Sequence, residues 1–123
     1  MKHRNRKSRL SRTTDQRKAL VRSLLTSLLT HGSITTTESK AKVLVAELDQ
    51  LVAKVRRQAE QREQIRCAKQ VLFQESAQRN LMEKVLPVAQ TRTSGFTRTT
   101  RLGPRPGDGA QMISVELFVA EKQ

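Results

Sequence analysis

The sequence predicts an α+β protein in which four or so helices pack on a small mixed sheet, preceded by an extended basic N-terminal arm. Three observations support this class. Apolar residues recur at helical spacing through residues 13–88, and two strand-like runs follow after residue 96. The first 22 residues carry nine Lys or Arg against one acid, Asp15. At 123 residues, the chain is long enough for one domain with a single modest core.

The N-terminal arm, residues 1–14, has no periodic apolar face. Up to Arg12, its one aliphatic residue besides Met1 is Leu10. Such a segment cannot bury enough apolar surface to offset the entropy lost when its backbone is ordered. We therefore expect the arm to be disordered until it binds a polyanion, and residues 15–123 to form a single α+β domain.

The first helix is expected to begin after Thr13, because Thr13 and Gln16 have the spacing of a capping box. Leucines recur along it until Gly32, which can adopt the left-handed conformation that ends a helix. The β-branched run Ser33–Thr37 predicts a short strand, and Thr37 then precedes a second helix. The buried stripe of this second helix is expected to be Ala41, Leu44, Leu48, Leu51, Val52 and Val55.

The middle of the chain is patterned less clearly. Arg56–Gln64 is charged or amide apart from Ala59 and contains no Gly or Pro, so it fits a polar loop as well as a continuous helix. Ser76 is a candidate N-cap of a fourth helix, which Pro87 is expected to end. Between these segments, a third helix is marked by Ile65, Ala68, Val71 and Leu72.

The C-terminal part predicts an antiparallel hairpin. The runs Thr97–Leu102 and Met112–Val119 are strand-like, and the turn-forming segment Gly103–Ala110 separates them. With Ser33–Thr37 as a possible third strand, they complete the small sheet.

Two arginines of the hairpin have a spacing that bears on their roles. Arg98 and Arg101 are three positions apart, so on a strand their side chains emerge on opposite faces. Neither is expected to be buried without a partner. We expect one of them to reach an acid such as Glu116 and the other to be free for a phosphate.

The net charge of the chain indicates what kind of partner it binds. A formal net charge of +13 and a pI near 11.3 indicate an anionic partner, with nucleic acid the first candidate and an acidic membrane surface the second. No apolar run approaches the roughly 20 residues of a membrane-spanning helix, and no signal-peptide pattern is present. We expect a cytoplasmic protein that does not act at a membrane.

Catalytic and metal sites have little support in the sequence. His3 and His31 have no Cys, Asp or Glu cluster at ligand spacing, and Cys67 lies in an apolar helical pattern that predicts a buried thiol. The segment Gly107-Asp108-Gly109 lacks the strand–loop–helix context of a phosphate-binding loop, so we interpret it as a tight turn. We expect no enzyme activity, no cofactor, no metal and no small-molecule substrate.

The basic residues favour recognition of folded RNA by its phosphates, grooves and shape. The arm has no aromatic residue for base stacking, and the later candidate is Phe96. Two alternatives stay open: a DNA-binding architectural protein, although no helix-turn-helix, zinc or β-ribbon signature is present, and an enzyme that acts on RNA. The residues expected to contact RNA are Lys2, His3, Arg4, Arg6, Lys7, Arg9, Arg12, Arg17, Lys18, Arg22, Arg92, Arg98, Arg101 and Arg105.

Three motifs, in order along nearly the whole chain, resemble one known family. The first runs from Met1-Lys2-His3-Arg4 to Arg17-Lys18-Ala19, the second is Ile34–Thr37 with Ala41-Lys42, and the third runs from Arg92 to Leu117. Together they resemble the bacterial large-subunit ribosomal protein seventeen family, although Ser94 and Phe96 replace its Gly and Tyr. The resemblance implies a structural rRNA-binding protein on the outer face of the large subunit, near the nascent-chain exit and beside neighbouring large-subunit ribosomal proteins.

Deletion of residues 1–12 tests whether the arm is the main contact. If about six of the early basic residues meet phosphates, affinity for RNA should fall on the order of a thousandfold or more between about 50 and 200 mM salt. Without the arm, the plot of log affinity against log salt concentration should be clearly flatter. A truncated protein with the full-length slope would show that the arm is not the main contact.

Overall fold

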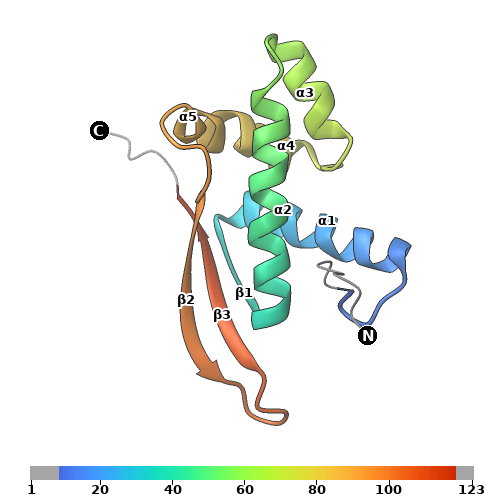
Figure 1. The fold of residues 1–123 in the computed structure, drawn as a ribbon, viewed down its shortest axis with the longest axis vertical. Helices are drawn as coiled ribbons and strands as arrows, with labels where there is room; N and C mark the ends of the chain where they lie inside the picture. The colour runs from blue at the N-terminus through green and yellow to red at the C-terminus, as the bar shows by residue number, and fades with distance from the viewer. Residues whose placement is uncertain (1–8, 119–123) are drawn as a thin grey trace, which may run out of the picture.

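The computed structural model describes residues 9–118 (Figure 1). Three helices and a strand come first: α1 (Thr14–His31), β1 (Ser33–Thr37), α2 (Glu38–Arg56) and α3 (Gln61–Lys69). A further helical stretch follows, made of α4 (Glu75–Asn80), the π-helical turn η1 (Leu81–Val85) and α5 (Leu86–Ala89). The hairpin strands β2 (Thr97–Pro104) and β3 (Gln111–Leu117) end the described part. The α+β class and the hairpin are confirmed.

The three strands form one sheet in the order β1-β3-β2. Both strand pairs are antiparallel, so the sheet is antiparallel throughout and the expectation of a mixed sheet was wrong in this respect. The reason is that β1 pairs with a strand far along the chain, and no local pattern determines the relative direction of two such strands.

Both ends of α1 follow their local sequence. The Thr13 hydroxyl accepts a hydrogen bond from the Gln16 N–H, and the Gln16 side chain accepts one from the Thr13 N–H, each at 3.4 Å. This is the expected capping box. Gly32 has φ 83°, its N–H donates to Leu28 O at 2.8 Å, and its carbonyl accepts from the Leu117 N–H at 2.9 Å. One glycine therefore ends the helix and starts the pairing of β1 with β3.

The core lies between α2, α1 and one face of the sheet, and α2 runs alongside the strands in Figure 1. All six residues of the predicted α2 stripe are buried. They meet Leu25, Leu28 and Leu29 of α1 and, from β3, Ile113 and Val115. Cys67 is buried, as expected from its position in the α3 pattern.

The segment between α2 and α3 resolves the open alternative in the middle of the chain. Helix α2 ends at Arg56 and α3 begins at Gln61, so a short polar loop interrupts what could have been one helix. Helix α3 ends at Lys69, so Val71 and Leu72 lie beyond it. Leu72 is nevertheless completely buried, which explains why the pair extended the apolar pattern.

Two expectations about the fourth helix were wrong. The helix begins at Glu75 with Gln74 in the cap position, so Ser76 is inside the first turn. Pro87 does not end the helix, which continues to Ala89. The π-helical turn makes this possible, because the Leu86 N–H donates to Leu81 O, one residue further back than in an α-helix. Such a widened turn relieves the clash of a proline ring with the preceding turn.

The hairpin is slightly longer than expected at its tip. Gly103 and Pro104 belong to β2, and the turn occupies Arg105–Ala110. The expected last strand residue, Val119, and most of the arm lie outside the described residues. Within residues 9–118, no helix is both long and apolar enough to cross a membrane.

Candidate nucleic-acid interface

The first group of expected contacts lies on and just before α1, and we call it the arm–helix surface. It consists of Arg9, Arg12, Arg17, Lys18 and Arg22. Lys18 and Arg22 are one turn apart, so they share one face of α1. The other expected arm residues lie outside the described part of the chain: Lys2, His3, Arg4, Arg6 and Lys7.

A tight turn precedes α1 and contains two residues of this surface. Leu10 and Ser11 have φ 52° and 54°, and the Arg12 N–H donates to Arg9 O at 3.1 Å. The Arg12 side chain also donates to Leu10 O at 2.9 Å. Both Arg9 and Arg12 remain exposed. The turn therefore holds two guanidinium groups beside the start of a rigid helix.

Arg22 is held more firmly than its neighbours. Its Nε donates to the carbonyl of Val71 at 3.0 Å, and its guanidinium carbon lies 4.0 Å from the centroid of the Phe73 ring. This contact is a cation–π interaction between α1 and the α3–α4 connection. Sequence reasoning missed Phe73. The sign of Phe73 in the sequence is that a large apolar residue directly follows the apolar pair Val71-Leu72.

The second group lies where the hairpin begins and ends, and we call it the hairpin-base cluster. The guanidinium carbons of Arg92 and Arg98 lie 3.9 and 5.9 Å from the centroid of the Phe118 ring. Arg92 also donates to Gly95 O at 3.2 Å. Both arginines are exposed. Two positive charges are thus gathered on one aromatic ring.

Arg56, at the end of α2, supports this cluster and was not predicted. Its Nη1 donates to the carbonyls of Ala89 at 3.0 Å and Arg92 at 3.1 Å. A cation suits the carbonyls left unpaired where a helix such as α5 ends. Arg56 therefore ties the C-terminal end of α5 and the following loop to α2.

Arg98 and Arg101 emerge on opposite faces of the sheet, as expected. Arg98 is paired in register with Glu116, and Arg101 with the core residue Ile113. Both arginines are exposed. The expectation that Glu116 is the acid partner was wrong. Arg101 lies on the helix-covered face of the sheet and pairs with Glu38, at the start of α2, at 3.6 Å.

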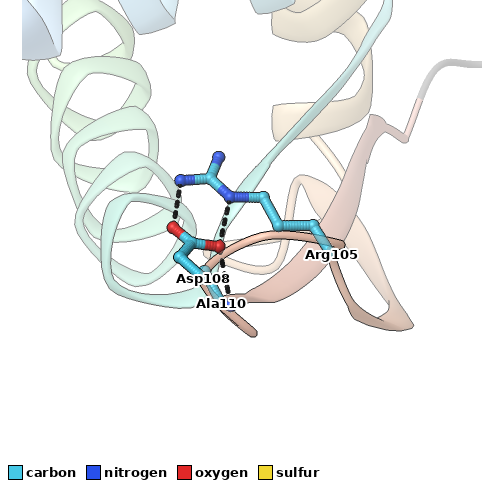
Figure 2. Close-up of polar contacts among 3 residues, drawn as sticks. All are labelled: Arg105, Asp108 and Ala110. Atoms are coloured by element: carbon cyan, nitrogen blue, oxygen red, sulfur yellow. Dashed lines mark hydrogen bonds and ion pairs between the residues drawn. The ribbon is translucent and has the colours of Figure 1, made fainter.

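Arg105 belongs to the turn rather than to an open basic patch. Figure 2 shows its guanidinium facing the Asp108 carboxylate, with Nε donating to Oδ1 at 2.8 Å and Nη2 to Oδ2 at 2.6 Å. The Ala110 N–H donates to the same Oδ1 at 3.1 Å. These bonds to the charged form hold the pKa of Asp108 well below its ordinary value, the Arg105 bond contributing most. The tight turn expected at residues 107–109 is confirmed.

Phe96 is not available to stack on a base. Its side chain is 1% exposed and packs in the core, while its carbonyl accepts from the Phe118 N–H at 2.7 Å. The neighbouring Gly95 has φ 74°, whereas Ser94 is not at positive φ, so the Ser in place of the family's Gly is accommodated without strain.

The arm–helix surface and the hairpin-base cluster lie on opposite sides of α2. In Figure 1, α1 begins at the right, whereas β2 begins and β3 ends at the left. Within residues 9–118, no group of three or more His, Cys, Asp or Glu could hold a metal ion. The site is therefore a pair of separate cationic surfaces on one folded body.

The sequence matches a known protein family over most of its length. Residues 20–118 match the family model described as Ribosomal protein L17. The chain belongs to the ribosomal protein L17 family. Members of this family are structural, non-enzymatic proteins of the large ribosomal subunit, which works in the cytoplasm. The expected family is confirmed, and it is a family of structural proteins and not of enzymes.

The similarity extends over all or nearly all of the length of these relatives. The chain is 39% identical over 120 residues to the large ribosomal subunit protein bL17 of Gemmatimonas aurantiaca, covering 98% of this chain and 100% of that protein. It is 38% identical over 112 residues to the protein of the same name from Clostridium perfringens, covering 89% and 95%. The protein of that name from Clostridium botulinum shows the same identity and coverage.

The Arg105–Asp108 pair gives a pH prediction. Because the folded pKa of Asp108 is lowered, the stability that this pair contributes is fully present above the ordinary Asp pKa and is lost as pH falls through the lowered one. We expect the Asp108 carboxyl ¹³C signal of the native protein to titrate well below the ordinary value of about 3.9. In Arg105→Gln, the midpoint should rise toward that value; an unmoved midpoint would assign the lowered pKa to another cause.

Proposed function

We propose that this protein binds large-subunit rRNA through its arm, the arm–helix surface and the hairpin-base cluster. The body positions these three parts and performs no reaction. The family resemblance supports a location on the outer face of the subunit, near the nascent-chain exit and beside neighbouring ribosomal proteins.

One observation carries this proposal. Nine of the fourteen residues expected to contact RNA lie within residues 9–118, and two of the nine, Arg101 and Arg105, form ion pairs. The other seven make no ion pair with any residue that the structure describes. Cations that a fold leaves without carboxylate partners are the ones that can neutralise phosphates.

The geometry also favours binding without a large rearrangement of the body. Arg22 and Arg92 are each held by a backbone carbonyl and an aromatic ring, so little side-chain freedom is lost when they bind. The arm would order only on contact. Because the two surfaces lie on opposite sides of α2, they would meet separate segments of rRNA, which a folded RNA can supply and a short straight duplex cannot.

Glutamine substitutions of Arg98 and Arg101 test the assignment as a matched pair on one strand. Arg98→Gln should lower affinity for large-subunit rRNA and reduce the salt slope by about one, because a phosphate contact is lost. Arg101→Gln should leave that slope unchanged and cost less than about 1 kcal/mol of unfolding free energy, because its pair with Glu38 is exposed.

Filter binding at several salt concentrations measures the slopes, and thermal unfolding measures the stability. A duplex DNA of equal length serves as competitor and should displace the rRNA only at higher concentration. Equal losses of slope in the two variants, or equal competition by DNA, would contradict the proposal.

A further inference from the structure

Phe73 is the most exposed large apolar side chain in the described part of the chain, at 68%. A single exposed apolar residue is common on protein surfaces and carries no inference alone. Phe73 differs because a cation from another element lies over its ring, the Arg22 guanidinium of α1 at 4.0 Å. Residues 51 positions apart in sequence are thus brought together at the surface.

Arg22 keeps unused donors beside this ring. Its Nε is taken by the Val71 carbonyl, but neither Nη group donates to any residue that the structure describes. A guanidinium has four N–H donors on these two nitrogens, in a fixed fork that matches a phosphate. Because Phe73 is still 68% exposed under this contact, the pair presents the uncovered part of an aromatic ring together with a phosphate donor, both held in place before binding.

Phe73 also lines an open groove of about 760 Å³ between α3 and the α4–η1 helix. Ile65 and Met82 supply its other apolar lining. The charged residues that line it balance, since two are basic and two acidic: Lys69, Arg79, Glu75 and Glu83. Such a groove does not attract phosphate as a whole. It suits a neutral nucleobase, whose faces stack on aromatic rings and whose edges hydrogen-bond to amides and carboxylates.

Phe73 and the groove lie next to α1, and this position indicates how a base would reach them. Lys18 precedes Arg22 by one turn on the same face, so an RNA backbone that contacts Lys18 arrives next at Arg22 and Phe73. In a duplex, the bases are stacked inside, so only a loop or bulge nucleotide can turn outward to an aromatic side chain.

We propose that Phe73, Arg22 and the groove beside them bind an unpaired nucleotide of the large-subunit rRNA. The base stacks on Phe73, and the Arg22 Nη groups bind its phosphate. The inference rests on the proposed function, because it assigns a specific contact within the same RNA complex.

Phe73→Ala in the full-length protein tests the site. Loss of one stacked base should weaken binding to large-subunit rRNA roughly five- to 150-fold. The salt slope should not change, because a base contact releases no counterions. Arg22→Gln should instead reduce the slope by about one. Leu102→Ala is the matched control, since Leu102 is also apolar and 56% exposed but lies on the hairpin, and it should leave affinity unchanged.

Zero-length ultraviolet cross-linking of the wild-type complex gives a second measurement that does not depend on a variant. We expect a nucleotide adduct on Phe73 within the tryptic peptide Gln70–Arg79. If Phe73→Ala binds rRNA with wild-type affinity, or if the complex gives no such adduct, the nucleotide site is refuted while rRNA binding by the protein still stands. An adduct between this peptide and another ribosomal protein in native subunits would assign the groove to a protein partner and overturn it as well. Failure of the wild-type protein to bind rRNA would instead refute the proposed function.

Discussion

The packing of α2 is the interaction on which the rest of this structure depends. Helix α2 contacts α1, β1, β3, α3 and α5, and its six apolar residues form the middle of the core. With 36% hydrophobic residues and three Phe, the chain has material for one such core and no second one. Loss of this packing would loosen the arm–helix surface and the hairpin-base cluster together, because α1 and the sheet both pack against α2.

The charge of the chain sets the opposing constraint. A net charge of +13 disfavours a compact state by self-repulsion, and arginine is rarely buried without a partner. The fold reduces the repulsion and avoids burying unpaired arginines by keeping its cations on the surface. Several of these side chains also join neighbouring segments through hydrogen bonds. Arg22, Arg56 and Arg92 donate to backbone carbonyls of other segments or of a neighbouring loop. The same side chains thus stabilise the body and keep donors directed to the surface that an RNA would meet.

The sequence predicted what short spacings encode and missed what tertiary contacts decide. The capping box at Thr13, the turn at Gly32 and the α2 stripe all follow from local patterns, and each is confirmed. The expectation that Pro87 ends the fourth helix was wrong, because a π-helical turn, which no local pattern signals, lets the helix continue past it. Glu38 as the partner of Arg101 depends on strand register and on the position of α2. The stack of Arg22 on Phe73 joins distant segments, so neither residue alone indicated it.

The reactivity of two lysines in native large subunits tests most directly whether the arm–helix surface faces RNA. Lys18 on α1 and Lys54 on α2 are both exposed in the structure, so an amine-specific reagent should modify both in the free protein. Mass spectrometry of the same reaction on intact subunits should show Lys18 protected and Lys54 still reactive. Lys18 as reactive in intact subunits as in the free protein would contradict the account, because the arm–helix surface would then not face the RNA.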